Sequence, residues 1–442
     1  MRRCTPGTAV RRAPWPRTFA ASVVVAALAI ACTRAPATEI TADPSGPSRT
    51  VSVATGSRTA SSPTSPISTR RVTLDPVEDA WTAAIDRAVA GSHVSVAVGV
   101  DDRIVYVHDA EQMRIPASNE KLLTSMTALD AFGPGHRFPT VAAATARTRS
   151  GVLRGDLWLI GGGDPELTDA DLTQLAEEIR ARGVHAIAGS VIGDTSAFDR
   201  SWWAPGWVPG LSRDYVTRTT ALALDGNHVA GTPEEAAAEV LTSALRARGV
   251  TVGGSPQVGP APPTTRALAG VRSDPLAQIL ARQNHDSVNF DAEMLTKALG
   301  DEAAGAPGTT AHGAAAIEAW AAGHGVRTEI FDGSGLSHRD RVSARGLATL
   351  LLLAQRRPWA DVLWASLPAP GEGTMEGRLA GVPVRAKTGT LFETPVSALS
   401  GYVTSLDGRR LAFSIISRGL DEATAVEIED AVVTTLAGIR AP

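Results

Sequence analysis

The feature that most constrains the fold of this chain is a serine followed three residues later by a lysine at the start of an apolar helix. Pro116 precedes the pair Ser118 and Lys121, and the apolar residues after it recur with helical spacing, at Leu122, Met126 and Leu129. Side chains three positions apart share one face of a helix. We therefore expect the hydroxyl and the amine to lie together in the first turn of a buried amphipathic helix.

The pair has a chemical and a structural interpretation. A serine hydroxyl attacks a carbonyl when a base takes its proton, and lysine is such a base when burial or a second cation lowers its pKa. In the structural interpretation, Ser118 is a helix N-cap and Lys121 a solvated side chain. The chain carries 42 Lys and Arg residues, but its only lysines are Lys121, Lys297 and Lys387. Because arginine cannot act as a base, a lysine kept at this position favours the chemical interpretation.

Two further motifs follow in the chain. Ser287 and Asn289 lie two residues apart before an expected helix, where Asn289 by itself would be an ordinary N-cap. Lys387-Thr388-Gly389-Thr390 ends a run of alternating valines that predicts an edge strand, and Gly389 is expected to let a substrate backbone approach. Lys-Thr-Gly is rare by chance in a chain with so few lysines, so the three motifs together favour a catalytic constellation.

In this order, Ser118-x-x-Lys121, Ser287-x-Asn289 and Lys387-Thr388-Gly389 are the motifs of the penicillin-recognising serine enzymes. Among these, the chain resembles the class C low-molecular-mass penicillin-binding proteins. The resemblance extends from about residue 75 to 436 and includes residues 155–165, 204–207, 332–337 and 373–374. It implies a D-alanyl-D-alanine carboxypeptidase that acts without a cofactor on peptidoglycan stem peptides ending in D-Ala-D-Ala and is acylated by β-lactam antibiotics.

The resemblance also implies a role for each motif residue. Ser118 is expected to attack the carbonyl, Lys121 to accept its proton, and Ser287 to relay that proton to the leaving amine. Asn289 is expected to hold the substrate backbone.

At the third motif, Thr388 and Thr390 are expected to bind the terminal carboxylate of the substrate. Lys387 is expected to keep the site positive and to serve as the second cation beside Lys121. Backbone N–H groups of Ser118 and Thr390 would form the oxyanion hole.

The patterns predict an α/β fold of the α+β type. An antiparallel sheet flanked by helices, as in penicillin-binding and serine β-lactamase domains, is expected to carry an inserted smaller α/β domain. The catalytic domain is predicted over residues 73–144 and 271–442, with the insert over 145–270. Strands are expected over 92–100, 103–108, 156–160, 186–192, 396–404 and 411–417, and helices from Asp75, over 169–182, 233–248 and 275–282, and from residues 289 and 422.

The N-terminus predicts export. Five arginines and no acid accompany an apolar run from Phe19 to Ala31, which predicts a signal peptide over residues 1–31. Ala29-Ile30-Ala31-Cys32 resembles a lipobox, so we expect lipidation of Cys32, with plain secretion as the alternative. Residues 32–72 are expected to be a disordered tether, because 21 of the 39 residues in 33–71 are Ser, Thr or Pro. Membrane contact is thus expected only through the N-terminus.

Composition excludes several functions. Loss of residues 1–31 changes the formal net charge from -4 to -9, which gives the body no general attraction for nucleic acid. The second cysteine, Cys4, lies within the signal peptide, so cysteine chemistry is excluded. The nine histidines show no metal-binding spacing, and no metal site is expected.

Other functions are compatible with the same motifs. These are a peptidoglycan D,D-endopeptidase, a β-lactamase, and a non-catalytic β-lactam-binding wall module. A β-lactamase is disfavoured because the chain has no Glu-x-x-Leu-Asn stretch and no suitably placed tyrosine. An acid that often follows Trp207 in the family is missing here, which leaves the residue preferred before D-Ala-D-Ala open.

Overall fold

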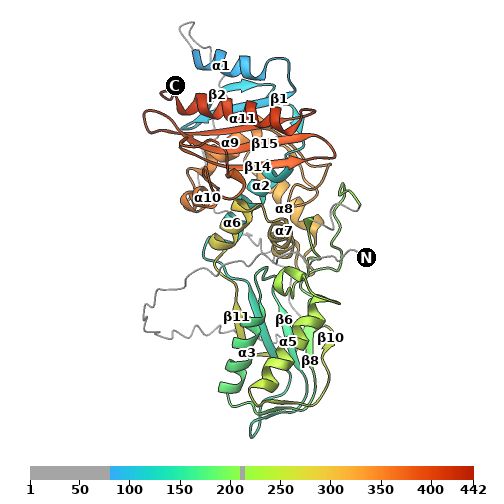
Figure 1. The fold of residues 1–442 in the computed structure, drawn as a ribbon. Coiled ribbons are helices and arrows are strands. Elements are labelled where there is room, and N and C mark those ends of the chain that lie inside the picture. The colour runs from blue at the N-terminus through green and yellow to red at the C-terminus, as the bar shows by residue number, and fades with distance from the viewer. Residues whose placement is uncertain (1–79, 210–214) are drawn as a thin grey trace, which may run out of the picture. The chain divides into compact units, whose positions relative to one another are not determined.

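The computed structural model describes residues 80–209 and 215–442, and its largest regular unit is a five-stranded antiparallel sheet (Figure 1). The strand order is β14-β15-β16-β1-β2, so the two N-terminal strands complete a sheet begun by the three C-terminal ones. β1 pairs with β16 along its whole length, from Val94 opposite Ser417 to Val100 opposite Leu411. The bounds are β1 Val94–Val100, β2 Arg103–His108, β14 Val384–Leu391, β15 Val396–Thr404 and β16 Arg410–Ser417.

This sheet is apolar on both faces. Along β15 and β16, Leu399 and Phe413 pack in the hydrophobic cluster that includes helices α1 (Ala80–Val89) and α11 (Glu422–Ala437). The alternate residues Ala398, Tyr402 and Ala412 pack on the opposite face with α9 (Ala344–Ala354). Figure 1 shows α11 and α9 on either side of the strands. Burying each large apolar side chain stabilises the fold by about 1.5–3 kcal/mol. The predicted antiparallel sheet flanked by helices is confirmed; the predicted helix cap at Asp75 lies outside the described residues.

Helix α2 (Glu120–Phe132) follows a 3₁₀ turn, η1 (Ala117–Asn119), and is buried around its whole circumference. Every side chain from Glu120 to Leu129 is buried, including those of Lys121 and Thr124. The expectation of an amphipathic helix is therefore wrong. Leucine spacing identified one apolar face, whereas helices α6, α7 and α8 also cover the polar positions.

The helices beside α2 bring the second motif close to Ser118. α7 (Asn289–Ala304) begins at Asn289 and is preceded by Val288 at the cap position, so Asn289 is not a helix N-cap. The remaining elements of this part of the chain are α6 Leu276–His285, α8 Thr310–Gly323, α10 Ala360–Ser366, η3 Gly373–Met375, and a small sheet of β3 Met113–Arg114, β12 Thr328–Glu329 and β13 Arg341–Ser343.

A second five-stranded sheet, of order β10-β8-β6-β4-β11, is mixed: β8 runs parallel to both β6 and β10. The first strand of this sheet begins at Pro139, before the predicted start of the insert at residue 145. The division of the chain into domains remains a prediction. Its own hydrophobic cluster contains residues of helices α3 and α5. The bounds are β4 Pro139–Ala144, β6 Leu157–Gly161, α3 Asp169–Ala181, β8 Val191–Asp194, η2 Asp225–Asn227, α5 Pro233–Ala247, β10 Gln257–Val258 and β11 Arg266–Arg272.

The strand expected over residues 186–192 is two strands in two different sheets. β7 (Ala186–Ile187) lies between β5 (Val152–Leu153) and β9 (Thr251–Val252), whereas β8 belongs to the five-stranded sheet. Between them, Asp156 accepts a hydrogen bond from the backbone N–H of Ser190. A Cβ at Gly189 would lie 2.2 Å from that same carboxylate, so the chain changes sheets where only glycine fits. Apolar residues stand on both sides of this short break, at Ala186 and Ile187 and at Val191 and Ile192, which is why the sequence predicted a single strand.

Within residues 80–209 and 215–442, no helix is both long and apolar enough to cross a membrane.

Candidate active site

Lys121 and Ser118 are in hydrogen-bond contact, as their spacing predicted. Lys121 Nζ lies 3.0 Å from Ser118 Oγ, 2.6 Å from Asn289 Oδ1 and 2.7 Å from the carbonyl oxygen of Ser334. The last two groups can only accept at those atoms, so each engages one N–H of the lysine. In this geometry a neutral amine has both N–H groups engaged and its lone pair left for Ser118 Oγ, which is the arrangement that a serine and a lysine base would require.

Burial is the main cause that lowers the pKa of Lys121, to about 8. The charges of the buried carboxylates, Asp332 and Glu293 foremost, act against burial and raise that pKa. Lys387 is affected as well: burial, and next the charge of Lys121, hold the pKa of Lys387 well below its usual value. The charge of Lys121 thus disfavours the charged form of Lys387, and burial is the larger effect there, as it is at Lys121.

Asn289 joins two parts of the site. Its amide oxygen accepts from Lys121, and its amide nitrogen donates to the backbone carbonyl of Tyr215 at 3.0 Å. Both hydrogen-bonding ends of the side chain are therefore used, one by the base and one by the cavity wall. The N-cap interpretation leaves these contacts unexplained.

Strand β14 lies at the edge of the catalytic sheet, as predicted, and its glycine allows a close approach. A Cβ at Gly389 would lie 2.9 Å from the backbone nitrogen of Ser118 and 3.1 Å from the carbonyl oxygen of Pro116. The glycine thus allows the turn at Ser118 to approach the strand, a contact that the sequence analysis did not expect. Lys387, also on β14, is buried and donates to the carbonyl of Thr388 at 2.8 Å.

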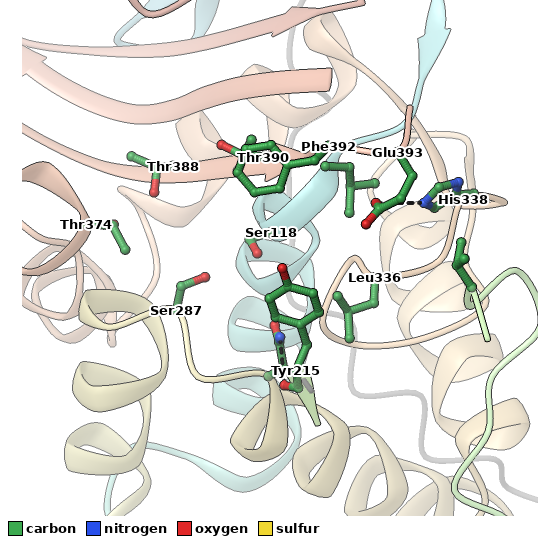
Figure 2. Close-up of a pocket in the computed structure, with 14 residues that line it drawn as sticks. Ser118, Tyr215, Ser287, Leu336, His338, Thr374, Thr388, Thr390, Phe392 and Glu393 are labelled. Atoms are coloured by element: carbon green, nitrogen blue, oxygen red, sulfur yellow. Dashed lines mark hydrogen bonds and ion pairs between the residues drawn. The ribbon is translucent and has the colours of Figure 1, made fainter. Parts of the chain in front are cut away.

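A cavity of about 390 Å³ opens at Ser118 and brings the three motifs together. Of the predicted residues, those that line it are Ser118, Ser287, Asn289, Thr388, Gly389 and Thr390. Figure 2 shows Ser118 between Thr390 of β14 and the ring of Tyr215, with Ser287 and Thr388 on one side and His338 and Glu393 on the other. Lys121 and Lys387 lie behind this surface, buried.

Sequence reasoning missed one wall of the cavity. This wall consists of Val208, Tyr215, Leu336, His338, Phe392 and Glu393. Thr374, which was also missed, lines another part of the cavity. His338 Nε2 lies 3.8 Å from Glu393 Oε2, and Thr394 Oγ1 lies 3.3 Å from His338 Nδ1. The stretches 204–207, 332–337 and 373–374 had been singled out only for their resemblance, and no periodicity could show that they converge.

Two buried carboxylates shape the turn that holds Lys121. Glu293 accepts hydrogen bonds from the backbone N–H groups of Gly333 and Ser334, at 3.0 and 2.9 Å. Asp332 accepts from the backbone N–H of Gly335 and from the indole of Trp207, at 2.8 and 2.7 Å. The Ser334 carbonyl is thereby fixed toward Lys121 Nζ.

Two residues of the site, Ala117 and Ser287, have a strained backbone. Ala117, directly before Ser118, has φ 48°, and Ser287 has φ 57°. Left-handed backbone at a non-glycine residue costs on the order of 1 kcal/mol, and such residues cluster at functional sites. Residues 80–209 and 215–442 contain no group of three or more His, Cys, Asp or Glu side chains that could hold a metal ion.

Comparison with solved structures places the fold. Penicillin binding protein 4 (dacB) from Haemophilus influenzae matches with a TM-score of 0.70 at 21% identity, over 80% of this chain and 99% of that one. A second structure of that protein, complexed with a β-lactam, matches with a TM-score of 0.65 at 23% identity, over the same shares of the two chains. The fold is thus that of a penicillin-binding protein.

Sequence comparisons define the family. The model of the D-Ala-D-Ala carboxypeptidase 3 (S13) family matches residues 79–232 and 228–439. A D-alanyl-D-alanine carboxypeptidase of Actinomadura sp. (strain R39) is 32% identical over 81% of this chain and 84% of its own length. The carboxypeptidase DacB of Mycolicibacterium smegmatis is 31% identical over 72% of this chain and 75% of its own. The chain belongs to the S13 family, which confirms the predicted class C penicillin-binding protein and serine-type D-Ala-D-Ala carboxypeptidase.

Proposed function

We propose that the protein removes the terminal D-alanine from peptidoglycan stem peptides through an acyl-enzyme on Ser118. The observation that carries this proposal is the position of Lys121 Nζ, which lies 3.0 Å from Ser118 Oγ while two acceptors hold its other N–H groups. This arrangement leaves the hydroxyl as the one neighbour that can give the amine a proton.

In the proposed reaction, Ser118 Oγ bonds to the carbonyl carbon between the two D-alanines as its proton moves to Lys121. The backbone N–H groups of Ser118 and Thr390 would stabilise the oxyanion, a contact worth about 3–4 kcal/mol. The C–N bond then breaks, and Ser287 passes the proton from Lys121 to the amine of the departing D-alanine. Water next cleaves the ester, which returns Ser118 to its hydroxyl form.

Substrate binding is assigned to the remaining motif residues. Asn289 would hold the peptide backbone, Thr388 and Thr390 the terminal carboxylate, and Lys387 would supply positive potential nearby. Gly389 would leave room for the substrate between strand and nucleophile. A β-lactam would enter the same path and stop at the acyl-enzyme, as the β-lactam complex of the Haemophilus protein suggests for the fold.

Mass spectrometry tests the acyl-enzyme. The body, residues 73–442, is incubated with benzylpenicillin, and we expect one adduct, on Ser118, that is lost in Ser118→Ala. The same body should release D-alanine from a peptide ending in D-Ala-D-Ala, and EDTA should not stop it. Amidation of the peptide C-terminus should lower kcat/KM at least tenfold, about 1.4 kcal/mol. Equal turnover of the free and amidated peptides would instead favour the D,D-endopeptidase.

We also propose that residues 1–31 direct export of the protein and that a lipid on Cys32 anchors it to the membrane. The support is the arginine-rich start, the apolar run and the Ala-Ile-Ala-Cys stretch. All of these lie outside the described residues. In cells, Cys32→Ser should move the protein from the membrane fraction to the medium or soluble envelope fraction. Unchanged fractionation would contradict the lipid anchor.

A further inference from the structure

Ser287, the serine proposed to relay the proton to the leaving amine, lies in a very short loop. Helix α6 ends at His285 and α7 begins at Asn289, so only residues 286–288 join the two helices. Ser287 has φ 57°, a left-handed conformation that a serine keeps only when the surrounding structure imposes it. Figure 2 shows its side chain in the cavity, on the side of Ser118. The loop thus needs a device that holds it in place.

The Ser287 side chain has no hydrogen bond of its own in the part of the chain that the structure describes. A relay hydroxyl must lie within hydrogen-bond reach of both Lys121 and the leaving nitrogen. Without a partner to direct the hydroxyl, the loop backbone sets its position. That position therefore depends on whatever fixes the ends of α6 and α7.

An ion pair joins these two helix ends. Arg282, in the last turn of α6, donates from Nε to Asp291 Oδ2 at 2.8 Å and from Nη2 to Asp291 Oδ1 at 2.5 Å. Asp291 lies in the first turn of α7 and is fully buried. The helix dipoles favour a cation at the end of α6 and an anion at the start of α7, and the two parallel hydrogen bonds fix distance and orientation. The pair thus sets the gap that the Ser287 loop bridges.

A second acid reaches Arg282 from the mixed sheet. Glu166 Oε1 lies 3.4 Å from Arg282 Nη1. Glu166 directly follows the glycine-rich stretch 161–165, in the turn between β6 and α3, and its backbone N–H donates to Asp164 Oδ1 at 2.8 Å. The sequence analysis singled out this stretch only through its resemblance, and the proposed reaction does not use it. Its position beside Arg282 connects the mixed sheet to the Ser287 loop.

We propose that Arg282 is a positioning residue that holds Ser287 in place for proton relay, and that Glu166 makes the mixed sheet part of this device. The inference rests on the proposed function, because it concerns the serine that serves the leaving amine. Arg282 does not line the cavity at Ser118. It acts through the loop whose two ends it joins to Asp291.

Two leaving groups that differ in their need for a proton test this role. In a peptide ending in D-Ala-D-Ala, the C–N bond breaks and the amine must receive the proton that Ser118 gave to Lys121. In the thioester with sulfur in place of that nitrogen, the C–S bond breaks and a thiolate leaves without a proton. The proton on Lys121 then passes to water. A misplaced Ser287 should therefore slow only the peptide.

Arg282→Lys is the test variant. It keeps a positive charge beside Asp291, but a single ammonium replaces the rigid two-bond fork. First-turnover release of D-alanine or of thiol is measured with enzyme in excess. We expect D-alanine release to slow about tenfold and thiol release to change less than about twofold. Equal slowing of both, as a weakened base would give, or no slowing of either, overturns the inference.

Ser287→Ala is the reference that separates the inference from the proposed function. It should slow D-alanine release about a hundredfold and spare thiol release, and adding Arg282→Lys should cost less than about twofold more. If Ser287→Ala does not distinguish the two substrates, the proposed relay fails and the inference fails with it. If Ser287→Ala distinguishes them and Arg282→Lys does not, only the inference fails.

Arg378→Lys is the matched control. Arg378 likewise pairs with one almost fully buried acid, Glu429, and one partly exposed acid, Asp430, at 2.9 and 2.6 Å, and it does not line the cavity. The exchange should lower stability without changing the ratio of D-alanine to thiol release. A changed ratio here would show that the ratio follows stability, and would overturn the inference.

Glu166→Gln tests the contribution of the mixed sheet. Glu166 is 19% exposed, so its replacement leaves no fully buried charge behind. It should lower the ratio of D-alanine to thiol release about threefold. This variant decides the matter if Arg282→Lys does not fold, because an unchanged ratio in Glu166→Gln would overturn the inference.

Discussion

Two buried lysines of this protein, Lys121 and Lys297, differ in the side chains that they contact. Each is fully buried, and each donates to backbone carbonyl oxygen. Lys297 also has a carboxylate, Asp199, at 2.8 Å, whereas Lys121 has a hydroxyl at 3.0 Å. For Lys121, carboxylates act only from a greater distance, since no ion pair of Lys121 is found among the described residues.

That difference predicts different charge states for the two lysines. Burial lowers the pKa of both lysines. At Lys297, the hydrogen bond and the charge of Asp199 oppose burial directly and favour the ammonium form. At Lys121, the pKa falls to about 8, within reach of a neutral solution. The carboxylate beside Lys297 thus favours the ammonium form there, whereas Lys121 has a serine hydroxyl in place of such a carboxylate.

The largest expected effect comes from Lys121→Arg. Arginine keeps the charge but cannot accept the serine proton, so acylation by benzylpenicillin should fall by about a thousandfold or more. The measurement is the second-order rate of adduct formation by mass spectrometry. Substantial labelling of this variant would mean that Lys121 is not the base and would remove the contrast with Lys297.

Lys387→Arg should have a smaller effect. Its proposed role is electrostatic, and arginine supplies the same positive charge, so we expect acylation to drop by about ten- to a hundredfold and remain measurable. The same adduct assay applies. A loss as large as that of Lys121→Arg would show that Lys387 also needs to release a proton.

The pH dependence sharpens the comparison further. As the proposed base, Lys121 would act as the neutral amine, so acylation should rise with pH and level off above a pKa of about 8. From pH 6 to 7 the rate should rise about tenfold, because few molecules are deprotonated there. This profile is obtained by measuring the rate of acylation by 6-aminopenicillanic acid at about eight pH values between about pH 5.5 and 9.5. A flat profile would exclude a titrating base in this range.

The smallest effect on catalysis is expected from Asp199→Asn. It removes the counter-charge of Lys297, a buried ammonium, and should lower the free energy of unfolding by about 2 kcal/mol, less than for a wholly buried pair because Asp199 is 26% exposed. Urea unfolding measures this change. Acylation by 6-aminopenicillanic acid should stay within about threefold. A variant as stable as the native protein would show that Asp199 does not distinguish the two lysine sites.

Much of the catalytic side could be predicted from local sequence. The spacing of Ser118 and Lys121 is enough to bring their side chains together, because one helical turn decides it. Likewise, the valines before Lys387 and the hairpin pattern around Asp407-Gly408 predict strands that the structure contains. Burial is nearly continuous along β15, so the turn between two apolar stretches, rather than alternation, identified that hairpin.

Other features depend on contacts between distant segments, which no local pattern contains. The Ser334 carbonyl that holds Lys121 comes from 213 residues away in the chain. The break between β7 and β8 and the complete burial of α2 are likewise decided by what packs against them.

The sequence by itself predicted which residues carry the chemistry, from three short motifs in order and a lysine at the position of the expected base, where arginine could not serve. Only the tertiary structure decided what each lysine is for. Nothing in the sequence around Lys297 indicates that it donates to the carbonyls of residues 199, 201 and 219, which lie 78 to 98 positions earlier. The physical reason is that the charge state of a buried amine depends on the nearest oxygen atoms, and folding alone brings those atoms together.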